Sequence, residues 1–418
     1  MQTNQLLAMF SGSLLLLGLI AYLLGRSKAA RVRASGASMY SQPDQYAWFT
    51  VLSTAGPALA VGAVASILML SLGAEVSPLY LLIGCLLVAC IGLVVGIQMV
   101  RPNFHARQAI ESVIRFILAG AALISIFTTL GILVSIIFEA IRFFQMQNFW
   151  DFITGTTWNP GASFLEAAGR AKEGASAAQF GSVPLFAGTF MITFIAMLVA
   201  IPVGLLAAIY MAEFAPARIR TIAKPVLEVL AGIPTVVYGF FAAITVAPII
   251  VGIAGFFGLE ASFNNALAPG IVMGIMIIPF ISSLSDDVIN SVPDSMRQGA
   301  LALGLTKGEM IRDIVVPAAL PGIISASLLA VSRALGETMI VVMAAGMRPN
   351  LTANPLEDMT TVTVRIVAAL TGDQEFASAE TLSAFALGLV LFVVTLALNL
   401  VSVMMIRRFR EKYRVNNL

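Results

Sequence analysis

Nine long apolar runs constrain the fold of this chain more than any other feature of its 418 residues. They cover residues 5–25, 47–72, 79–100, 113–141, 184–212, 226–254, 268–289, 319–346 and 381–406. A helix needs about 20 mostly apolar residues to cross the hydrocarbon core of a bilayer. Only 11% of the residues are charged, compared with roughly 25% in soluble domains. The sequence therefore predicts an all-α polytopic membrane protein with nine spans.

Basic residues in the connecting segments predict how the spans are oriented. Lysine and arginine are enriched in cytoplasmic loops. Every second connector of this chain is rich in them: residues 26–46, 101–112, 213–225, 290–318 and 407–418. The other connectors carry few or none, including the two longer ones at 142–183 and 347–380. The pattern predicts an N-terminus outside the cytoplasm (N-out) and a C-terminus inside it (C-in).

The residue types present exclude a metal or nucleophile site built from cysteine and histidine. Cys85 and Cys90 lie five residues apart in an apolar run, which is not a zinc-binding spacing, and His105 is the only histidine. The phosphate-binding loop G-x-x-x-x-G-K-[ST] is absent, because "GLTKGEM" has the wrong order of residues. We therefore expect the chain to bind no metal or cofactor and to hydrolyse no ATP itself.

The cytoplasmic connector "SVPDSMRQGALALGLTKGEMIRDIVVPAALPG", residues 291–322, predicts two short helices joined by a tight turn. Ser291 is expected to cap the first helix, with Pro293 in its first turn and Asp294 at the capping-box position. Gly304 is placed to end this helix in the left-handed conformation. The first half of the connector is thus a short capped helix followed by a glycine turn.

The second half of the connector predicts another capped helix. Thr306 is expected to be its N-cap, and Glu309 completes a capping box. Pro317 and Pro321 mark the return of the chain to the membrane. The resulting elbow, about residues 291–318, is suited to dock as a rigid lever into a groove of another protein. Local chemistry leaves an ordinary interfacial connector as an equal alternative.

The spacing in this elbow resembles the cytoplasmic signature of ABC importer permeases: E-A-A, three residues, G, nine residues, then I-x-L-P. The positions that correspond are Gln298, Gly299 and Ala300, then Gly304, then Ile314, Val315, Val316 and Pro317. The sequence departs from the signature at Gln298, Gly299 and Val316, but it keeps the spacing. Three further stretches are similar to phosphate importer permeases of the PstC type: "TGTTWNP" (154–160), "LEVLAGIPTVVYGFF" (227–241) and "SRALGETM" (332–339).

The resemblance covers about residues 106–418 and implies a type I importer permease with a MetI-like core of six helices. Residues 1–105 would be an additional N-terminal region with three spans and no assigned role. The implied function is translocation of inorganic phosphate across the bacterial inner membrane. This is the task of a transport subunit and not of an enzyme.

The resemblance also implies partners. They are a second permease subunit (PstA type), two ATPase subunits (PstB type) that bind ATP and Mg²⁺, and a phosphate-binding protein (PstS type) that delivers substrate. The ATPases would dock on the elbow. The residues implied in coupling are Gln298, Gly299, Ala300, Gly304, Thr306, Glu309 and Pro317.

Arg333 and Glu337 are the candidate pathway residues, because they are charged side chains inside an apolar run. They are four residues apart, so both side chains are expected on one helix face, and Arg333 would lie about 16 Å into a span that starts near Gly322. Two hypotheses follow. Arg333 binds phosphate with its fork of donors while Glu337 holds it or closes the gate, or the two residues form a structural ion pair.

Two other charged positions allow similar alternatives. Glu228 is either a gate residue or a partner of Lys224 one turn before it, and Pro234 most simply bends its span. The neighbouring residues Asp286 and Asp287 are either solvated interfacial charges or part of the mouth of the pathway.

Other functions stay open at this point. A permease of the same fold could carry another oxyanion, such as phosphonate, sulfate or molybdate. An ion-coupled secondary transporter is a more distant alternative, since it would often show broken helices with charges in both halves of the chain.

Overall fold

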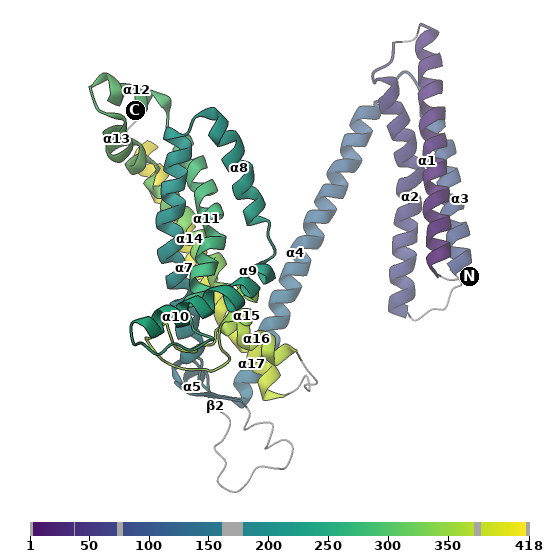
Figure 1. The fold of residues 1–418 in the computed structure, drawn as a ribbon. Helices are drawn as coiled ribbons and strands as arrows, with labels where there is room; N and C mark the ends of the chain where they lie inside the picture. Colours follow the sequence, from purple (N-terminus) through teal and green to yellow (C-terminus); the bar gives the residue numbers. More distant parts are fainter. Residues whose placement is uncertain (1–2, 37, 73–77, 161–178, 372–377, 415–418) are drawn as a thin grey trace. The chain divides into compact units, whose positions relative to one another are not determined.

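The computed structural model of the chain describes residues 3–36, 38–72, 78–160, 179–371 and 378–414. The chain forms two compact units, Met1–Leu130 and Gly131–Leu418, and almost every element is a helix (Figure 1). Nine helices in the described part are long and apolar enough to cross a membrane. The predicted all-α polytopic fold with nine spans is confirmed, and the orientation N-out, C-in stays a prediction.

Parts of five predicted connectors lie outside the described residues: residue 37 belongs to the connector 26–46, and residues 73–77 belong to the connector between the second and third spans. Residues 161–178 belong to the connector 142–183, residues 372–377 to the connector 347–380, and residues 415–418 to the C-terminal segment.

Unit 1 contains three complete helices and the beginning of a fourth. They are α1 (Thr3–Ala34), α2 (Pro43–Leu72), α3 (Pro78–Gln98) and α4 (Ala106–Met146), of which α4 continues into unit 2. Small residues let α2 and α3 approach closely: a Cβ atom on Gly92 would lie 2.0 Å from the carbonyl oxygen of Ser53. Tyr46 is buried and its hydroxyl donates to the carbonyl oxygen of Phe104. Unit 1 therefore has its own packed interior.

Helix α4 is a single helix of 41 residues, about 60 Å long at 1.5 Å per residue. Its ion pairs, Arg107–Glu111 and Glu139–Arg142, lie toward its two ends, and its centre is apolar. The two compact units divide within α4, whereas the sequence places a domain boundary at residues 105–106, at the start of this helix. That boundary separates an additional membrane region from a transport domain, and it stays a prediction.

Unit 2 contains the remaining elements. They are α5 (Phe149–Thr154), β1 (Trp158–Asn159), β2 (Gln179–Phe180), α7 (Val183–Ile209), η1 (Tyr210–Phe214), α8 (Ala217–Ala231), α9 (Thr235–Phe241), η2 (Ala242–Val246), α10 (Ala247–Phe256), α11 (Leu267–Asn290), α12 (Asp294–Ala302), α13 (Lys307–Met310), η3 (Ile311–Val315), α14 (Val316–Leu335), α15 (Met339–Ala344), α16 (Val362–Leu370) and α17 (Ala379–Arg414). Those named η are single π-helical turns. β1 and β2 pair antiparallel.

The core of unit 2 is built on α7 and α11, which lie side by side (Figure 1). Buried side chains of both helices, such as Ile192 and Ile277, pack with Ala334 of α14 and Ile340 of α15. The helix axes approach closely because a Cβ atom on Gly274 would lie only 2.8 Å from the carbonyl oxygen of Ala196. The elbow helices α12 and α13 lie at one end of unit 2, and α5 and β2 lie at the other (Figure 1).

The predicted span 226–254 is wrong at its beginning. Helix α8 ends at Ala231, and the stretch long enough to cross a membrane is Thr235–Phe256. Pro234 supplies the reason, because a proline disfavours the helical conformation of the residue before it and cannot donate to the preceding turn. The predicted bend at Pro234 is confirmed, and α8 becomes a separate helix without any buried residue.

The predicted span 319–346 is wrong at both ends. The helical stretch runs from Lys307 through η3 to Leu335, and a new helix, α15, begins at Met339. Gly336 ends α14 as its C-cap. The Glu337 carboxylate then accepts hydrogen bonds from the backbone N–H groups of Met339 and Ile340, at 3.1 and 3.4 Å, and so starts α15.

Candidate functional site

The elbow forms the two short helices that its sequence predicts. Gly304 follows α12 with φ of +86°, in the left-handed conformation that glycine adopts without strain. The capping box is also present: the Thr306 N–H donates to Glu309 Oε2 at 2.8 Å, and the Glu309 N–H donates to Thr306 Oγ1 at 3.4 Å. These local predictions are confirmed.

The predicted cap of α12 by Ser291 is wrong. The Ser291 hydroxyl donates to the carbonyl oxygen of Val288, at the end of α11, and Pro293 occupies the N-cap position of α12 without a side-chain hydrogen bond. Asp294 forms an ion pair with Arg297 at 3.1 Å in place of a capping box. The cause is that Ser291 already ends the preceding helix as its C-cap.

The elbow is anchored on one face and open on the other. Ala300 is buried in an apolar cluster with Ala208 of α7, Ile289 of α11 and Met310 of α13. Gln298 and Gly299, the other two residues of the E-A-A-like triplet, are exposed. The elbow is thus fixed to the ends of two core helices, as a lever requires.

The exposed face of the elbow carries large apolar side chains. Leu303, directly before the turn, is 84% exposed, and Met296 and Leu301 are 42% and 48% exposed. Exposed apolar groups gathered at one position mark a surface for protein contact. Sequence reasoning did not single out these three residues, although their apolar character beside Gly304 is visible in the sequence.

Pro317 lies inside a continuous helix and does not break it. It follows η3, the π-helical turn Ile311–Val315, and is the second residue of α14. A π turn absorbs the clash and the missing N–H that a proline causes in an α-helix. At the predicted re-entry into the membrane, the structure thus has a wider π-helical turn within one continuous helix. This helix joins the elbow to Arg333.

Arg333 lies in the last turn of α14, two residues before its end, so the predicted mid-span position is wrong. Its guanidinium carbon stands 5.4 Å from the centre of the Phe280 ring on α11, within range of a cation–π interaction. Arg333 is exposed and forms no ion pair with any described residue. The guanidinium donors are available to an anion.

The predicted Arg333–Glu337 pair on one helix face is wrong, because α14 ends between the two residues. The Glu337 carboxylate caps α15, and the Glu337 carbonyl oxygen accepts a hydrogen bond from Thr363 Oγ1 at 3.0 Å. Glu337 also lines a small cavity of about 10 Å³ with four threonines. They are Thr189, Thr193, Thr361 and Thr363. Arg333 and Glu337 thus form no ion pair in the described part of this structure.

Glu228 lines a cavity of about 180 Å³ between α8 and α11, which we term the α8 cavity. Its lining is Met211, Lys224, Leu227, Glu228, Ala231, Pro279, Phe280, Ser283 and Asp286. The structure therefore brings Glu228 into the same cavity as Phe280, the ring beside Arg333. The predicted Lys224–Glu228 pair is wrong, because the Lys224 ammonium pairs with Asp286 and Asp287.

Asp286, for which the sequence left two alternatives open, lines the α8 cavity. Its side chain is 2% exposed, and it accepts from Arg220 at 3.3 Å, Lys224 at 3.5 Å and the Asn290 amide at 2.9 Å. Asp287 is 65% exposed, so the prediction of a solvated charge holds for Asp287 and fails for Asp286. Helical periodicity indicates the burial of Asp286, since position 286 shares the buried face of Ser282 and Ile289.

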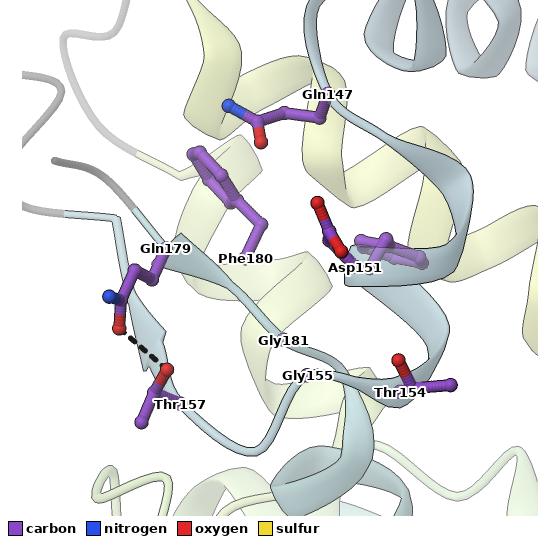
Figure 2. A pocket seen from close by; sticks show the side chains of 9 residues that line it. Gln147, Asp151, Thr154, Gly155, Thr157, Gln179, Phe180 and Gly181 are labelled. Carbon is purple, nitrogen blue, oxygen red and sulfur yellow. Dashed lines mark hydrogen bonds between the residues drawn. The ribbon is translucent and has the colours of Figure 1, made fainter.

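The β1–β2 end of unit 2 contains a cavity of about 320 Å³ (Figure 2). Its lining is Gln147, Asp151, Phe152, Thr154, Gly155, Thr157, Gln179, Phe180 and Gly181. Figure 2 shows Thr157 bonded to Gln179 across the strand pair, at 2.6 Å. The described residues of this lining include a carboxylate, Asp151, and no cation, and this charge disfavours an anionic ligand.

Asp358 lies outside the candidate spans, in the segment between α15 and α16. Burial raises the pKa of its carboxyl, and the charge of Arg348 lowers that pKa to a smaller extent. Oδ1 is buried with no hydrogen-bond partner among the described residues. A carboxyl with a raised folded-state pKa stabilises the fold fully below its unfolded pKa and loses that contribution as pH rises through its folded pKa.

Asp358→Asn is therefore expected to raise the melting temperature at pH 7 by about 2 °C or less, because the amide carries no charge to desolvate. The gain should shrink as the pH falls from 7 toward 4, because the raised pKa lets the native carboxyl bind its proton at a higher pH than the unfolded one. Thermal unfolding of the purified protein at both pH values measures this, with Glu260→Gln, an exposed site in another connector, as control. An equal effect at both pH values would contradict the assignment.

Comparisons with known proteins agree over both units of the chain. The family described as "Binding-protein-dependent transport system inner membrane component" matches residues 200–414, and the family described as "Phosphate ATP-binding cassette transporter" matches residues 12–76. The second match lies within the three spans that the sequence resemblance left outside. Similarity to transport families thus extends to the N-terminal region.

Individual relatives and a solved structure are also similar to this chain. The chain is 33% identical over 291 residues to the probable ABC transporter permease protein YqgH of Bacillus subtilis, covering 69% of this chain and 88% of that protein. It is 35% identical over 280 residues to the phosphate transport system permease protein PstC 1 of Mycobacterium tuberculosis, covering 62% and 81%. A chain of a bacterial ABC transporter involved in alginate import has a TM-score of 0.48 at 16% identity, covering 72% and 99%.

Proposed function

We infer the function from one premise: this chain belongs to the family of binding-protein-dependent transport system inner membrane components. It is a permease of an ABC importer and a multi-pass protein of the bacterial inner membrane. We propose that its substrate is inorganic phosphate. The names of the PstC relatives and the phosphate transporter family matched at residues 12–76 support this choice.

The exposed guanidinium of Arg333 is the observation that carries the proposal. It stands at the end of a helix, beside an aromatic ring and without a carboxylate partner among the described residues. An arginine presents paired N–H donors that match the oxygens of a phosphate group. Arg333 would therefore bind the substrate during translocation. Glu337 would hold α15 in place beside it, and Glu228 and Pro234 would shape the gate at the α8 cavity.

The elbow would couple this site to ATP hydrolysis in a partner. Gln298, Gly299 and the turn at Gly304 lie on its exposed side, next to Leu303. The capping box of Thr306 and Glu309 would fix the start of the second helix, α13. Pro317 would lie where the elbow continues into α14. An ATPase groove that receives the elbow would move this helix as one body.

The proposed assembly contains this chain, a second permease of the PstA type, two ATPases of the PstB type and a phosphate-binding protein of the PstS type. ATP and Mg²⁺ would bind to the ATPases alone. This chain would hold no cofactor and perform no hydrolysis.

Uptake of radiolabelled phosphate into vesicles that contain the assembled complex tests the proposal. We expect uptake that requires ATP and the binding protein, and that excess unlabelled phosphate abolishes. Uptake that persists without ATP would contradict the coupling to an ATPase. Competition by phosphonate, sulfate or molybdate, and not by phosphate, would assign the chain to another oxyanion.

A further inference from the structure

The guanidinium of Arg297 joins three elements at the elbow end of unit 2. Arg297 belongs to α12, and its side chain is 14% exposed. It donates to Glu213 Oε1 of η1 at 2.9 Å and to the carbonyl oxygens of Ile289, at 2.7 Å, and Val292. Glu213 is 8% exposed. One side chain therefore ties the elbow to the end of α11 and to the end of α7.

The electrostatics of this contact make it selective for arginine. The last four carbonyl groups of a helix have no partner within the helix and carry its negative dipole end. The planar guanidinium of an arginine can donate to Ile289, Val292 and Glu213 at once. A lysine carries a single compact ammonium group, which cannot reproduce this arrangement of donors. A buried charge left without its partner is strongly destabilising. The three elements are thus held together and should move together.

Asp286 joins α11 to α8 one turn before this contact. Its buried carboxylate binds Arg220 and Lys224, both on α8. Helix α8 has no buried residue of its own, so these ion pairs are its principal polar attachment to the core among the described residues. Asp286 and Ile289 are three residues apart, on the same face of α11.

Helix α8 forms one wall of the α8 cavity, through Lys224, Leu227 and Glu228. Phe280 forms part of the opposite wall, and the Arg333 guanidinium stands over that ring. A displacement of α8 would therefore change access to the surroundings of Arg333.

We propose that the last turn of α11 is the junction that passes elbow movement to α8, with Arg297 and Asp286 as its two positioning residues. Arg297 makes the end of α11 follow the elbow, and Asp286 makes α8 follow the end of α11. The α8 cavity then widens or narrows with the ATPase cycle. This inference rests on the proposed function, because a partner ATPase must move the elbow.

Spin labels at positions 221 and 291 report the distance between α8 and the end of α11. Thr221 and Ser291 are exposed, so each can be replaced by cysteine after Cys85 and Cys90 are changed to serine. In the assembled complex we expect ATP to change the label separation. Arg297→Lys is expected to reduce that change at least about fivefold, although the ATPase still co-purifies and hydrolyses ATP. Arg142→Lys, in the exposed pair with Glu139, is the matched control and should behave as the parent protein.

The neighbouring carboxylates provide a second matched comparison. Asp286→Asn keeps the size of the side chain and removes its charge, so we expect the label separation to be altered before ATP is added. Asp287→Asn removes the more exposed partner of Lys224 on the same turn, and because an exposed ion pair contributes little, we expect a much smaller change in the separation.

Two results would overturn the proposal: an unchanged ATP response in Arg297→Lys, or equal resting separations in Asp286→Asn and Asp287→Asn. The uptake assay in vesicles that contain the assembled complex tests the substrate separately. A complex that shows the expected distance changes but carries sulfate in place of phosphate would overturn the proposed substrate and support the junction.

Discussion

Replacement of Arg333 by alanine is expected to lower ATP-dependent phosphate uptake roughly 10- to 100-fold. A hydrogen bond to a charged group contributes about 1.5–3 kcal/mol, and about 1.4 kcal/mol corresponds to a factor of ten. Because Arg333 is exposed and forms no ion pair with a described residue, its removal should leave folding and ATPase co-purification unchanged. Radiolabelled uptake, measured per amount of assembled complex, tests this expectation.

A comparison with Glu337 separates substrate binding from a structural role. Glu337→Gln keeps an oxygen that can cap α15 and should change uptake little, whereas Glu337→Ala removes the cap at a cost of about 1 kcal/mol. If the two residues acted as an ion pair, adding Glu337→Ala to Arg333→Ala would have no further effect. We expect the two effects to add. Arg107→Ala, an exposed arginine of unit 1, serves as the control, and normal uptake by Arg333→Ala would contradict the assignment.

Replacement of Gly304 by valine is expected to reduce co-purification of the ATPase at least about tenfold. Gly304 has φ of +86°, a conformation that costs other residues roughly 1–2 kcal/mol and a β-branched residue the most. The turn would relax and move Leu303 and Gln298 away from their positions on the docking face. The amount of ATPase retained on a tagged permease measures the effect.

Gly258 provides the matched control for this experiment. It also has a positive φ, +70°, and like Gly304 it has open space around its Cα. It follows α10 and lies outside the elbow. Gly258→Val should therefore introduce similar strain and retain the ATPase. Equal losses in both variants would show that strain alone, and not the elbow, accounts for the result.

Local features of the elbow could be predicted because a few neighbouring residues decide them. Gly304 is the residue that tolerates the left-handed turn, and Thr306 and Glu309 satisfy each other's backbone groups without help from the rest of the chain. Ser291 shows the limit of such reasoning. It can cap a helix on either side, and the preceding helix α11 already uses it.

The charged residues inside the apolar runs could not be placed in the same way. Arg333 and Glu337 have the spacing of a helical pair, but Gly336 and the new start of α15 separate them. Asp286 and Asp287 are chemically identical neighbours that both pair with Lys224, but only Asp286 is buried and also pairs with Arg220 of α8. One partner of Arg297, Glu213, is 84 residues away, and another, Ile289, lies on the preceding helix. The environments of Asp286 and Arg297 depend on contacts between segments distant in sequence, whereas the separation of Arg333 from Glu337 follows from the local helix end at Gly336.

By itself, the sequence determined that this chain has nine membrane spans, a capped elbow with a glycine turn and the signature of an importer permease. Composition, periodicity and short-range hydrogen bonds decide those features, and all of them act over a few consecutive residues. Only the tertiary structure decided that Arg333 is left available beside Phe280, that Asp286 pairs with α8 and that Arg297 reaches Glu213. The physical reason is that a buried charge is held by whichever partner the packing of helices brings within hydrogen-bond distance.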